Sequence, residues 1–83
     1  MKFTTYILFS GTLNKYYIGS TGDDIHGLIR KHNTNHKGFT GGVGDWELKY
    51  FEEYELKTDS LMREKQIKNW KSRKMIERLI AGS

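Results

Sequence analysis

The chain has 83 residues, of which 36% are hydrophobic, and its formal net charge is +4. This length and composition predict one small domain spanning 1–83 with a modest core. The absence of cysteine excludes a disulfide framework and a cysteine-based zinc site. No apolar run approaches the roughly 20 residues of a membrane-spanning helix, and the first residues do not resemble a signal peptide. We therefore expect a cytoplasmic protein with no membrane partner.

Positive charge is concentrated in the last third of the chain. An acidic stretch comes first and contains Glu52, Glu53, Glu55 and Asp59. Basic residues then dominate, namely Arg63, Lys65, Lys68, Lys71, Arg73, Lys74 and Arg78. A surface of this kind attracts polyanions, so the charge distribution indicates a nucleic-acid partner.

The N-terminal part of the chain has the pattern of a β-hairpin. Two runs rich in aromatic and β-branched residues, at 5–7 and 17–21, flank a polar segment at 10–15. Such a pattern predicts two antiparallel strands joined by a tight turn. Pairing Phe9 with Asn14 would leave a loop of four residues, which is a common hairpin length.

This register would place two phenols side by side. It pairs Tyr6 with Tyr17, and residues paired across strands stand on the same face of the sheet. Gly19 beside them would give close access to the backbone. The two tyrosines are either a simple cross-strand aromatic pair or part of a reactive site, and the hairpin alone leaves both interpretations open.

The next segment predicts a helix and a loop. The segment Gly22–Asp24 has the features of a helix start. Residues at helical spacing then form one inward face, made by Ile25, Leu28, Ile29 and His32. The glycine-rich stretch 33–45 that follows is either a simple connection or a flap that contacts nucleic acid, with Lys37 as its cation.

The rest of the chain predicts one strand and two helices. Apolar residues alternate with charged ones at Trp46, Leu48 and Tyr50, which is typical of a half-buried strand. Thr58 or Asp59 would cap a helix that runs to about Lys71, and Ser72 would cap a last short helix. Its inward residues would be Met75, Ile76, Leu79 and Ile80. The order strand, strand, helix, strand, helix, helix predicts an α/β (α+β) fold with a small three-stranded antiparallel sheet flanked by helices.

Two side chains on inward helical faces are candidates for chemistry. Glu64 falls between Leu61 and Ile67 on the apolar side of its helix, where a carboxylate must be paired or bound. It either pairs with Lys68 at i+4 or binds a ligand. His32 is either a satisfied core histidine or a catalyst. His26 lies six residues before it and so off its face, and His36 falls in the predicted loop, so no helical i, i+4 histidine pair and no zinc site are expected.

The chain resembles the GIY-YIG nuclease family, and in particular its small bacterial YhbQ/URI-type branch. Tyr17-Ile18-Gly19 matches the second half of the signature, whereas Thr4-Thr5-Tyr6 stands where Gly-Ile-Tyr would be. Further matching stretches are Arg30-Lys31-His32-Asn33, Asp45-Trp46-Glu47-Leu48, Arg63-Glu64-Lys65-Gln66-Ile67-Lys68 and Leu79-Ile80. The resemblance covers nearly the whole chain and implies the fold given above, as a nuclease domain standing alone.

The resemblance also implies roles for individual residues. Glu64 would bind one divalent cation, Mg²⁺ or Mn²⁺, on the scissile phosphate. Tyr6 and Tyr17 would position or deprotonate the attacking water, assisted by His32. Residues that would contact DNA are Lys37, Lys68, Lys71, Arg73 and Lys74. The expected partner is DNA, duplex or branched, read with little sequence specificity by a monomer or weak dimer.

One position departs from the family pattern. The family arginine lies four residues before the histidine, and Leu28 occupies that position here. Arg30 is the nearest arginine and the remaining candidate for a catalytic cation, but it lies about 200° away around the helix. Losing a transition-state contact of this kind typically costs about 10²–10³ in rate. The resemblance therefore implies a phosphodiesterase that is slow.

Three functions remain open from the sequence. The first is a metal-dependent DNA endonuclease, and the second is a catalytically silent nucleic-acid-binding module on the same fold, which Leu28 favours. The third is a small protein-interaction domain whose basic surface is merely solvated. Salt-dependent DNA binding separates the third from the first two, and metal-dependent cleavage separates the first from the second.

Overall fold

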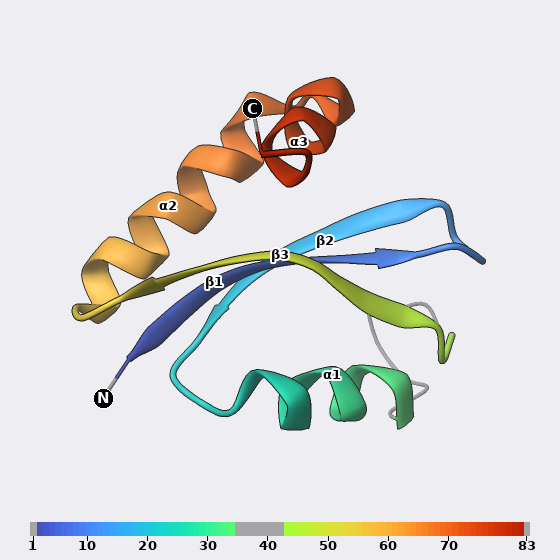
Figure 1. The fold of residues 1–83 in the computed structure, drawn as a ribbon, viewed down its shortest axis with the longest axis horizontal. Coiled ribbons are helices and arrows are strands. Elements are labelled where there is room, and N and C mark those ends of the chain that lie inside the picture. The colour runs from blue at the N-terminus through green and yellow to red at the C-terminus, as the bar shows by residue number, and fades with distance from the viewer. Residues whose placement is uncertain (1, 35–42, 83) are drawn as a thin grey trace.

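The computed structural model describes residues 2–34 and 43–82. Its elements are β1 (Phe3–Ser10), β2 (Lys15–Thr21), α1 (Ile25–Thr34), β3 (Trp46–Tyr54), α2 (Lys57–Trp70) and α3 (Arg73–Ile80). The three strands form an antiparallel sheet in the order β2-β1-β3. Helices α2 and α3 cover one face of the sheet and α1 covers the other (Figure 1). The predicted fold and order of elements are confirmed.

Each face of the sheet has its own apolar cluster. Ile7 and Ile18 pack with Ile67 of α2 and Ile76 of α3 on one face. On the other face, a second cluster packs against α1 and consists of Tyr6, Leu8 and Trp46. Because β1 is the central strand and both its faces are covered, every residue from 4 to 8 is buried. Within the described part of the chain, no helix is long and apolar enough to cross a membrane.

The hairpin register differs from the predicted one. Ser10 pairs with Lys15, which moves the four-residue loop to 11–14 and places Tyr6 opposite Gly19. The shift arises because Asn14 adopts a left-handed conformation with φ 53° and therefore belongs to the turn. Tyr6 and Tyr17 still share a face, since the pairing has moved by two positions and side chains alternate with a period of two.

Asp45 fixes this turn from a distant part of the sequence. Its carboxylate accepts hydrogen bonds from Ser10 Oγ at 2.6 Å, Thr12 N at 2.8 Å and Thr12 Oγ1 at 2.9 Å. The hydrogen bond from Ser10 is the largest of the effects that lower the pKa of Asp45. This contact joins the start of β3 to the β1–β2 loop and so fixes where the loop begins.

Strand β3 does not alternate through its whole length, as its sequence suggested. Leu48 pairs with Leu8, but Tyr50 pairs with Ile7, so one extra residue is accommodated between them as a bulge. Leu48 therefore packs towards α1, whereas Tyr50 packs against the cluster under α2 and α3. The bulge lets one edge strand supply apolar side chains to both covered faces.

The helix ends agree only partly with prediction. Asp24 Oδ2 accepts from Gly27 N at 3.0 Å and caps α1, and Ser72 Oγ accepts from Met75 N at 3.3 Å and caps α3. The predicted cap at Thr58 or Asp59 is wrong, because α2 begins at Lys57 without a side-chain cap. The prediction that Met75 points inward is also wrong, since it is 42% exposed.

Polar contacts to the sheet hold α2 in place of a cap. Thr5 Oγ1 donates to the Ser60 carbonyl at 2.8 Å, and the Ser60 hydroxyl lies 2.6 Å from Ser20 Oγ. One turn later, Arg63 Nε and Nη2 donate to the Glu52 carboxylate at 3.0 and 3.2 Å. These contacts fix the rotation of α2 and hence the direction in which its side chains point.

Candidate active site

Tyr6 is positioned by a glycine on the neighbouring strand. Its phenol lies across Gly19, the residue opposite it on β2, and only 3% of Tyr6 is exposed. A Cβ atom at position 19 would fall 2.6 Å from Tyr6 Cζ, well inside van der Waals contact. Gly19 therefore provides the space that the ring occupies. Burial raises the pKa of Tyr6, with smaller contributions from Tyr17 and Glu64, so its hydroxyl is protonated at neutral pH.

Tyr17 stands at the centre of an aromatic group. Its ring centroid lies 6.3 Å from that of Tyr6 and 5.1 Å from that of His32. Burial is the main cause that raises the pKa of Tyr17, and the Lys68 ammonium acts in the opposite direction. Burial lowers the pKa of His32, so its imidazole is neutral near pH 7 and can accept a proton.

Glu64 reaches the phenols from the other layer of the molecule. It lies one helical turn after Ser60, so it is on the face of α2 that turns towards the sheet. Its side chain is only 19% exposed and accepts a hydrogen bond from Lys68 Nζ at 2.6 Å. The charge of the carboxylate contributes to the raised pKa of both Tyr6 and Tyr17. The pair with Lys68, one of the two alternatives for this carboxylate, is present.

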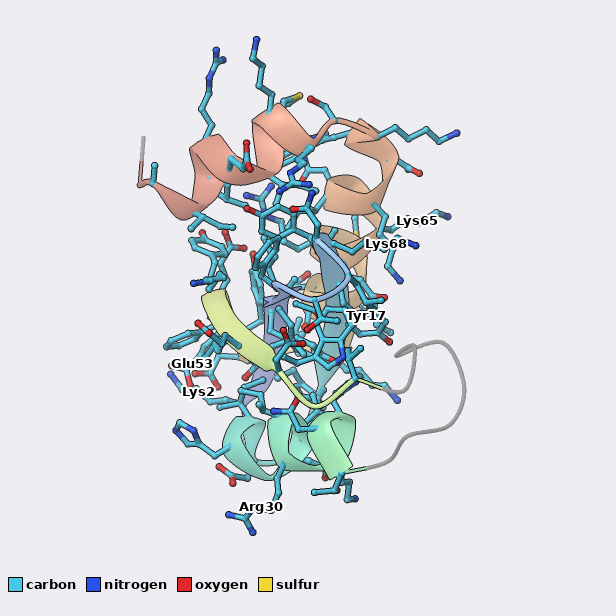
Figure 2. The ribbon with its side chains drawn as sticks, turned by 90° about the vertical axis from the view of Figure 1, so that its right-hand side faces the viewer. Lys2, Tyr17, Arg30, Glu53, Lys65 and Lys68 are labelled. Carbon is cyan, nitrogen blue, oxygen red and sulfur yellow. The ribbon has the colours of Figure 1, made fainter. Side chains whose placement is uncertain are left out.

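The two layers meet at one edge of the sheet. β2 is an edge strand, α2 packs on β1 and β2, and the Tyr17 side chain lies close enough to Lys68 for that ammonium to lower its pKa. Figure 2 shows Tyr17 and Lys68 on the same side of the molecule. The structure thus groups Tyr6, Tyr17 and His32 by their ring contacts, and the Glu64 carboxylate acts on both phenols through its charge.

Neither candidate on α1 brings a cation to this group. Leu28 packs against the cluster that contains Tyr6, Leu8 and Trp46, and it supplies apolar surface there. Arg30 is exposed, and its side chain points away from the sheet at the far end of the molecule (Figure 2). The structure therefore leaves Arg30 apart from the phenols, as its angle on the helix suggested.

The predicted DNA-contacting residues fall into different surroundings. Lys68 and Lys71 line a groove at the end of α2, and Lys74 is exposed on α3. Arg73 is engaged within the chain, because its Nη1 and Nη2 donate to Asn14 O and Oδ1 at 3.0 and 2.8 Å. Its guanidinium thereby holds the hairpin turn against α3. Lys37 and most of the glycine-rich segment lie outside the described residues.

Several residues that shape the site were not predicted. Asn33 exchanges two hydrogen bonds with the backbone of Trp46, at 2.7 and 3.1 Å, and so ties the end of α1 to the start of β3. Ser60 orients Glu64 from one turn away. The sequence could have indicated Ser60 only through its position four residues before an inward-facing glutamate. Its hydrogen-bond partners, Ser20 and Thr5, lie 40 and 55 residues away in the sequence. No local pattern reveals such partners.

The donor set around Glu64 suits one kind of cation. Across residues 2–34 and 43–82, no group of three or more histidine, aspartate or glutamate side chains could hold a metal ion. A cation bound at Glu64 would have this one carboxylate as its protein ligand, with waters and substrate oxygens completing the coordination. Mg²⁺ accepts such a set, since it keeps several waters and binds through one or two carboxylates and a phosphate.

Comparisons with known proteins concern the family and the fold. The family model described as the GIY-YIG catalytic domain matches residues 2–77, and the chain belongs to this family. The solution NMR structure of the UPF0213 protein BH0048 from Bacillus halodurans is similar in fold, with a TM-score of 0.61 and 27% sequence identity. The match covers 98% of this chain and 84% of that one. No match was found among curated proteins.

Family membership has a general consequence for function. The GIY-YIG domain implies a nuclease-type function that acts on nucleic acid and, in general, uses a divalent metal.

Proposed function

We propose that this protein is a metal-dependent endonuclease that hydrolyses phosphodiester bonds in DNA. The observation that supports it best is the meeting of two phenols, an imidazole and a carboxylate at the β2 edge of a GIY-YIG chain. The four groups come from β1, β2, α1 and α2. An apolar side chain at any of these positions could pack there without needing a polar partner. The basic residues Lys68, Lys71 and Lys74 would bind the DNA backbone with little sequence preference.

The directions of the pKa shifts suggest a separate catalytic role for each group. Both phenols are protonated at neutral pH because their pKa values are raised, so they serve better as hydrogen-bond donors than as bases. His32 is neutral there and faces Tyr17 at a ring distance of 5.1 Å. His32 is therefore the better acceptor for the proton of the attacking water, and Tyr17 would orient that water and the phosphate.

Glu64 would hold the divalent cation, which when bound would neutralise charge on the scissile phosphate. In the free protein the Lys68 ammonium forms an ion pair with this carboxylate, with 2.6 Å between Nζ and Oε2. Lys68 would therefore have to turn towards the substrate when the site is loaded. Its 51% exposed side chain has the freedom to do so.

A second function is favoured by Leu28. That residue packs in the core cluster beside Tyr6 and leaves the site without the guanidinium that the family pattern has there. A protein with this site could bind nucleic acid without cleaving it. The same fold and basic surface would then form a catalytically silent nucleic-acid-binding module.

A plasmid-nicking assay distinguishes the two functions. Supercoiled plasmid is incubated with the wild-type protein in Mn²⁺, in Mg²⁺ and in chelator, and the conversion to open circles is followed. We expect metal-dependent nicking that is abolished by Glu64→Gln and reduced by Tyr17→Phe. Glu53→Gln is the matched control, because Glu53 is an exposed carboxylate on the side of the molecule away from Tyr17 (Figure 2).

The control and the metal series decide the outcome. Nicking that persists in chelator, or that Glu64→Gln and Glu53→Gln reduce equally, would remove Glu64 from the site. DNA binding without any nicking in either metal would leave the silent module as the function. Absence of salt-dependent DNA binding would exclude both the endonuclease and the silent nucleic-acid-binding module.

A further inference from the structure

A groove of about 330 Å³ lies beside the candidate active site. It runs between the hairpin turn, the end of α2 and the start of α3. Its apolar floor is formed by Tyr16, Ile18 and Ile76, and its cationic rim by Lys15, Lys68 and Lys71. The volume is at the lower end of the range for ligand pockets, about 300–1,000 Å³. An apolar floor with a basic rim suits a ligand that has a flat apolar part and a negative charge.

Part of the positive charge at the rim has no acidic partner among the residues that the structure describes. Lys68 pairs with Glu64, and the Arg73 guanidinium at the same groove pairs with Glu77 at 3.2 Å. Lys15 and Lys71, in contrast, have no ion-pair partner among the residues that the structure describes. Both ammonium groups are therefore available to an anion at the mouth of the groove.

The groove is continuous with the site through α2. Glu64, Lys68 and Lys71 are spaced i, i+4 and i+7, so they lie on one side of the helix over about 10 Å of rise. Lys68 contacts the Glu64 carboxylate, lines the groove and lowers the pKa of Tyr17. A nucleic-acid strand whose phosphate is held near Glu64 would reach the groove with a neighbouring nucleotide.

We propose that this groove takes one unpaired nucleotide next to the scissile phosphate, with the base on the apolar floor and its phosphate between Lys15 and Lys71. The proposal rests on the proposed nuclease function and adds a substrate class, DNA with a junction between duplex and single strand. A fully paired duplex keeps its bases stacked inside the double helix. Its phosphates can therefore contact the rim of the groove, but its bases cannot reach the floor. A base freed from pairing can pack on the floor beside Tyr16, whose ring already contacts the Phe9 ring at a centroid distance of 4.8 Å and lies 5.3 Å from Arg73 Cζ. Stacking of a base on such aromatic and guanidinium groups is sequence-tolerant.

A substitution at Lys71 tests this without disturbing the fold. Lys71 ends α2 in a left-handed conformation with φ 49°, which glycine adopts without steric cost. Lys71→Gly therefore removes the ammonium and keeps the helix end. Lys57→Ala is the matched control, because it removes the same charge from an exposed position at the opposite end of α2.

Binding is measured by fluorescence anisotropy in chelator, so that cleavage plays no part. The probes are a short blunt duplex and the same duplex with a single-stranded tail at either end. We expect the wild-type protein to bind a tailed duplex about tenfold more tightly than the blunt one. Lys71→Gly should remove most of that preference, whereas Lys57→Ala should weaken the binding of both probes by the same factor. Tyr16→Leu should also reduce the preference, and Tyr16→Phe should retain it.

Each alternative result has a definite meaning. Equal wild-type affinity for blunt and tailed duplexes would overturn the proposal while leaving the nuclease function intact. If Lys71→Gly weakens both probes by the same factor, the groove is a duplex-backbone contact and the proposal is wrong. If the wild-type protein binds neither probe, the proposed nuclease function fails together with it.

Discussion

For the nuclease function proposed above, replacing Leu28 with arginine should raise the cleavage rate. Leu28 lies on the inward face of α1, one turn before His32, so a longer side chain there could reach the phenols. A guanidinium at that place would stabilise the charge that develops on the phosphate in the transition state. We expect Leu28→Arg to raise the cleavage rate about 10²-fold, which corresponds to roughly 2.7 kcal/mol.

The substitution also has a cost in stability that can be bounded. Full burial of a leucine side chain contributes about 1.5–3 kcal/mol, and Leu28 is only partly buried. Its loss should therefore lower the free energy of unfolding by about 1 kcal/mol, and the apolar stem of the arginine would recover part of this. Leu28→Gln is the matched control, because it loses the same packing and gains no charge.

Single-turnover cleavage with protein in excess measures the chemical step, and anisotropy measures DNA affinity separately. The rate should rise without a matching gain in affinity, because the new contact belongs to the transition state. Arg30→Ala should change cleavage little, since its side chain points into solvent. The reasoning fails if Leu28→Arg behaves like Leu28→Gln while Arg30→Ala abolishes cleavage, since Arg30 would then be the catalytic cation.

Three further outcomes follow from the packing and the pKa directions. Gly19→Ala should lower the free energy of unfolding by about 1–3 kcal/mol in urea titration, because the added Cβ collides with the Tyr6 ring; unchanged stability would show that the ring moves freely. Cleavage should rise with pH as His32 loses its proton, with a midpoint below 6.5 because burial lowers its pKa, and His32→Gln should remove this step from the pH–rate profile. The pKa of Asp45 is lowered, so the stability that this carboxylate contributes is complete above about pH 3.8 and is lost as the pH falls through its folded-state pKa. Asp45→Asn should be less stable than the wild type at pH 7 by thermal unfolding, and the difference should shrink in acid.

The order of elements was accessible to sequence reasoning because each segment has a clear period. The helical spacing of Ile25, Leu28 and Ile29 predicts the inward face of α1, and these residues pack as expected. The same logic placed Glu64 on the inward side of α2. Periodicity predicts which face of a helix or strand points inward. For these residues, that face was enough to predict where they pack.

Details fixed by distant partners were not accessible. The start of the hairpin turn depends on Asp45, which is 35 residues from Ser10 in the sequence. The rotation of α2 depends on Ser60, whose partner Thr5 is 55 residues away. The DNA contact of Arg73 stays a prediction, and its guanidinium also binds Asn14, which is 59 residues away in the sequence. Charge alone does not distinguish a cation that binds a partner from one that closes the fold.

The position of Leu28 affects the site in two ways that reinforce each other. It withholds a cation from the phosphate, and it adds apolar surface to the cluster that buries Tyr6. Burial is the main reason why the pKa of Tyr6 is raised, so the same leucine helps to keep that phenol protonated and leaves little phenolate to act as a base near neutral pH. A nearby guanidinium would lower the phenol pKa and share the proton transfer more evenly. With leucine in its place, the proposed mechanism would assign proton acceptance to His32, and the pH–rate profile should therefore report the imidazole rather than a phenol.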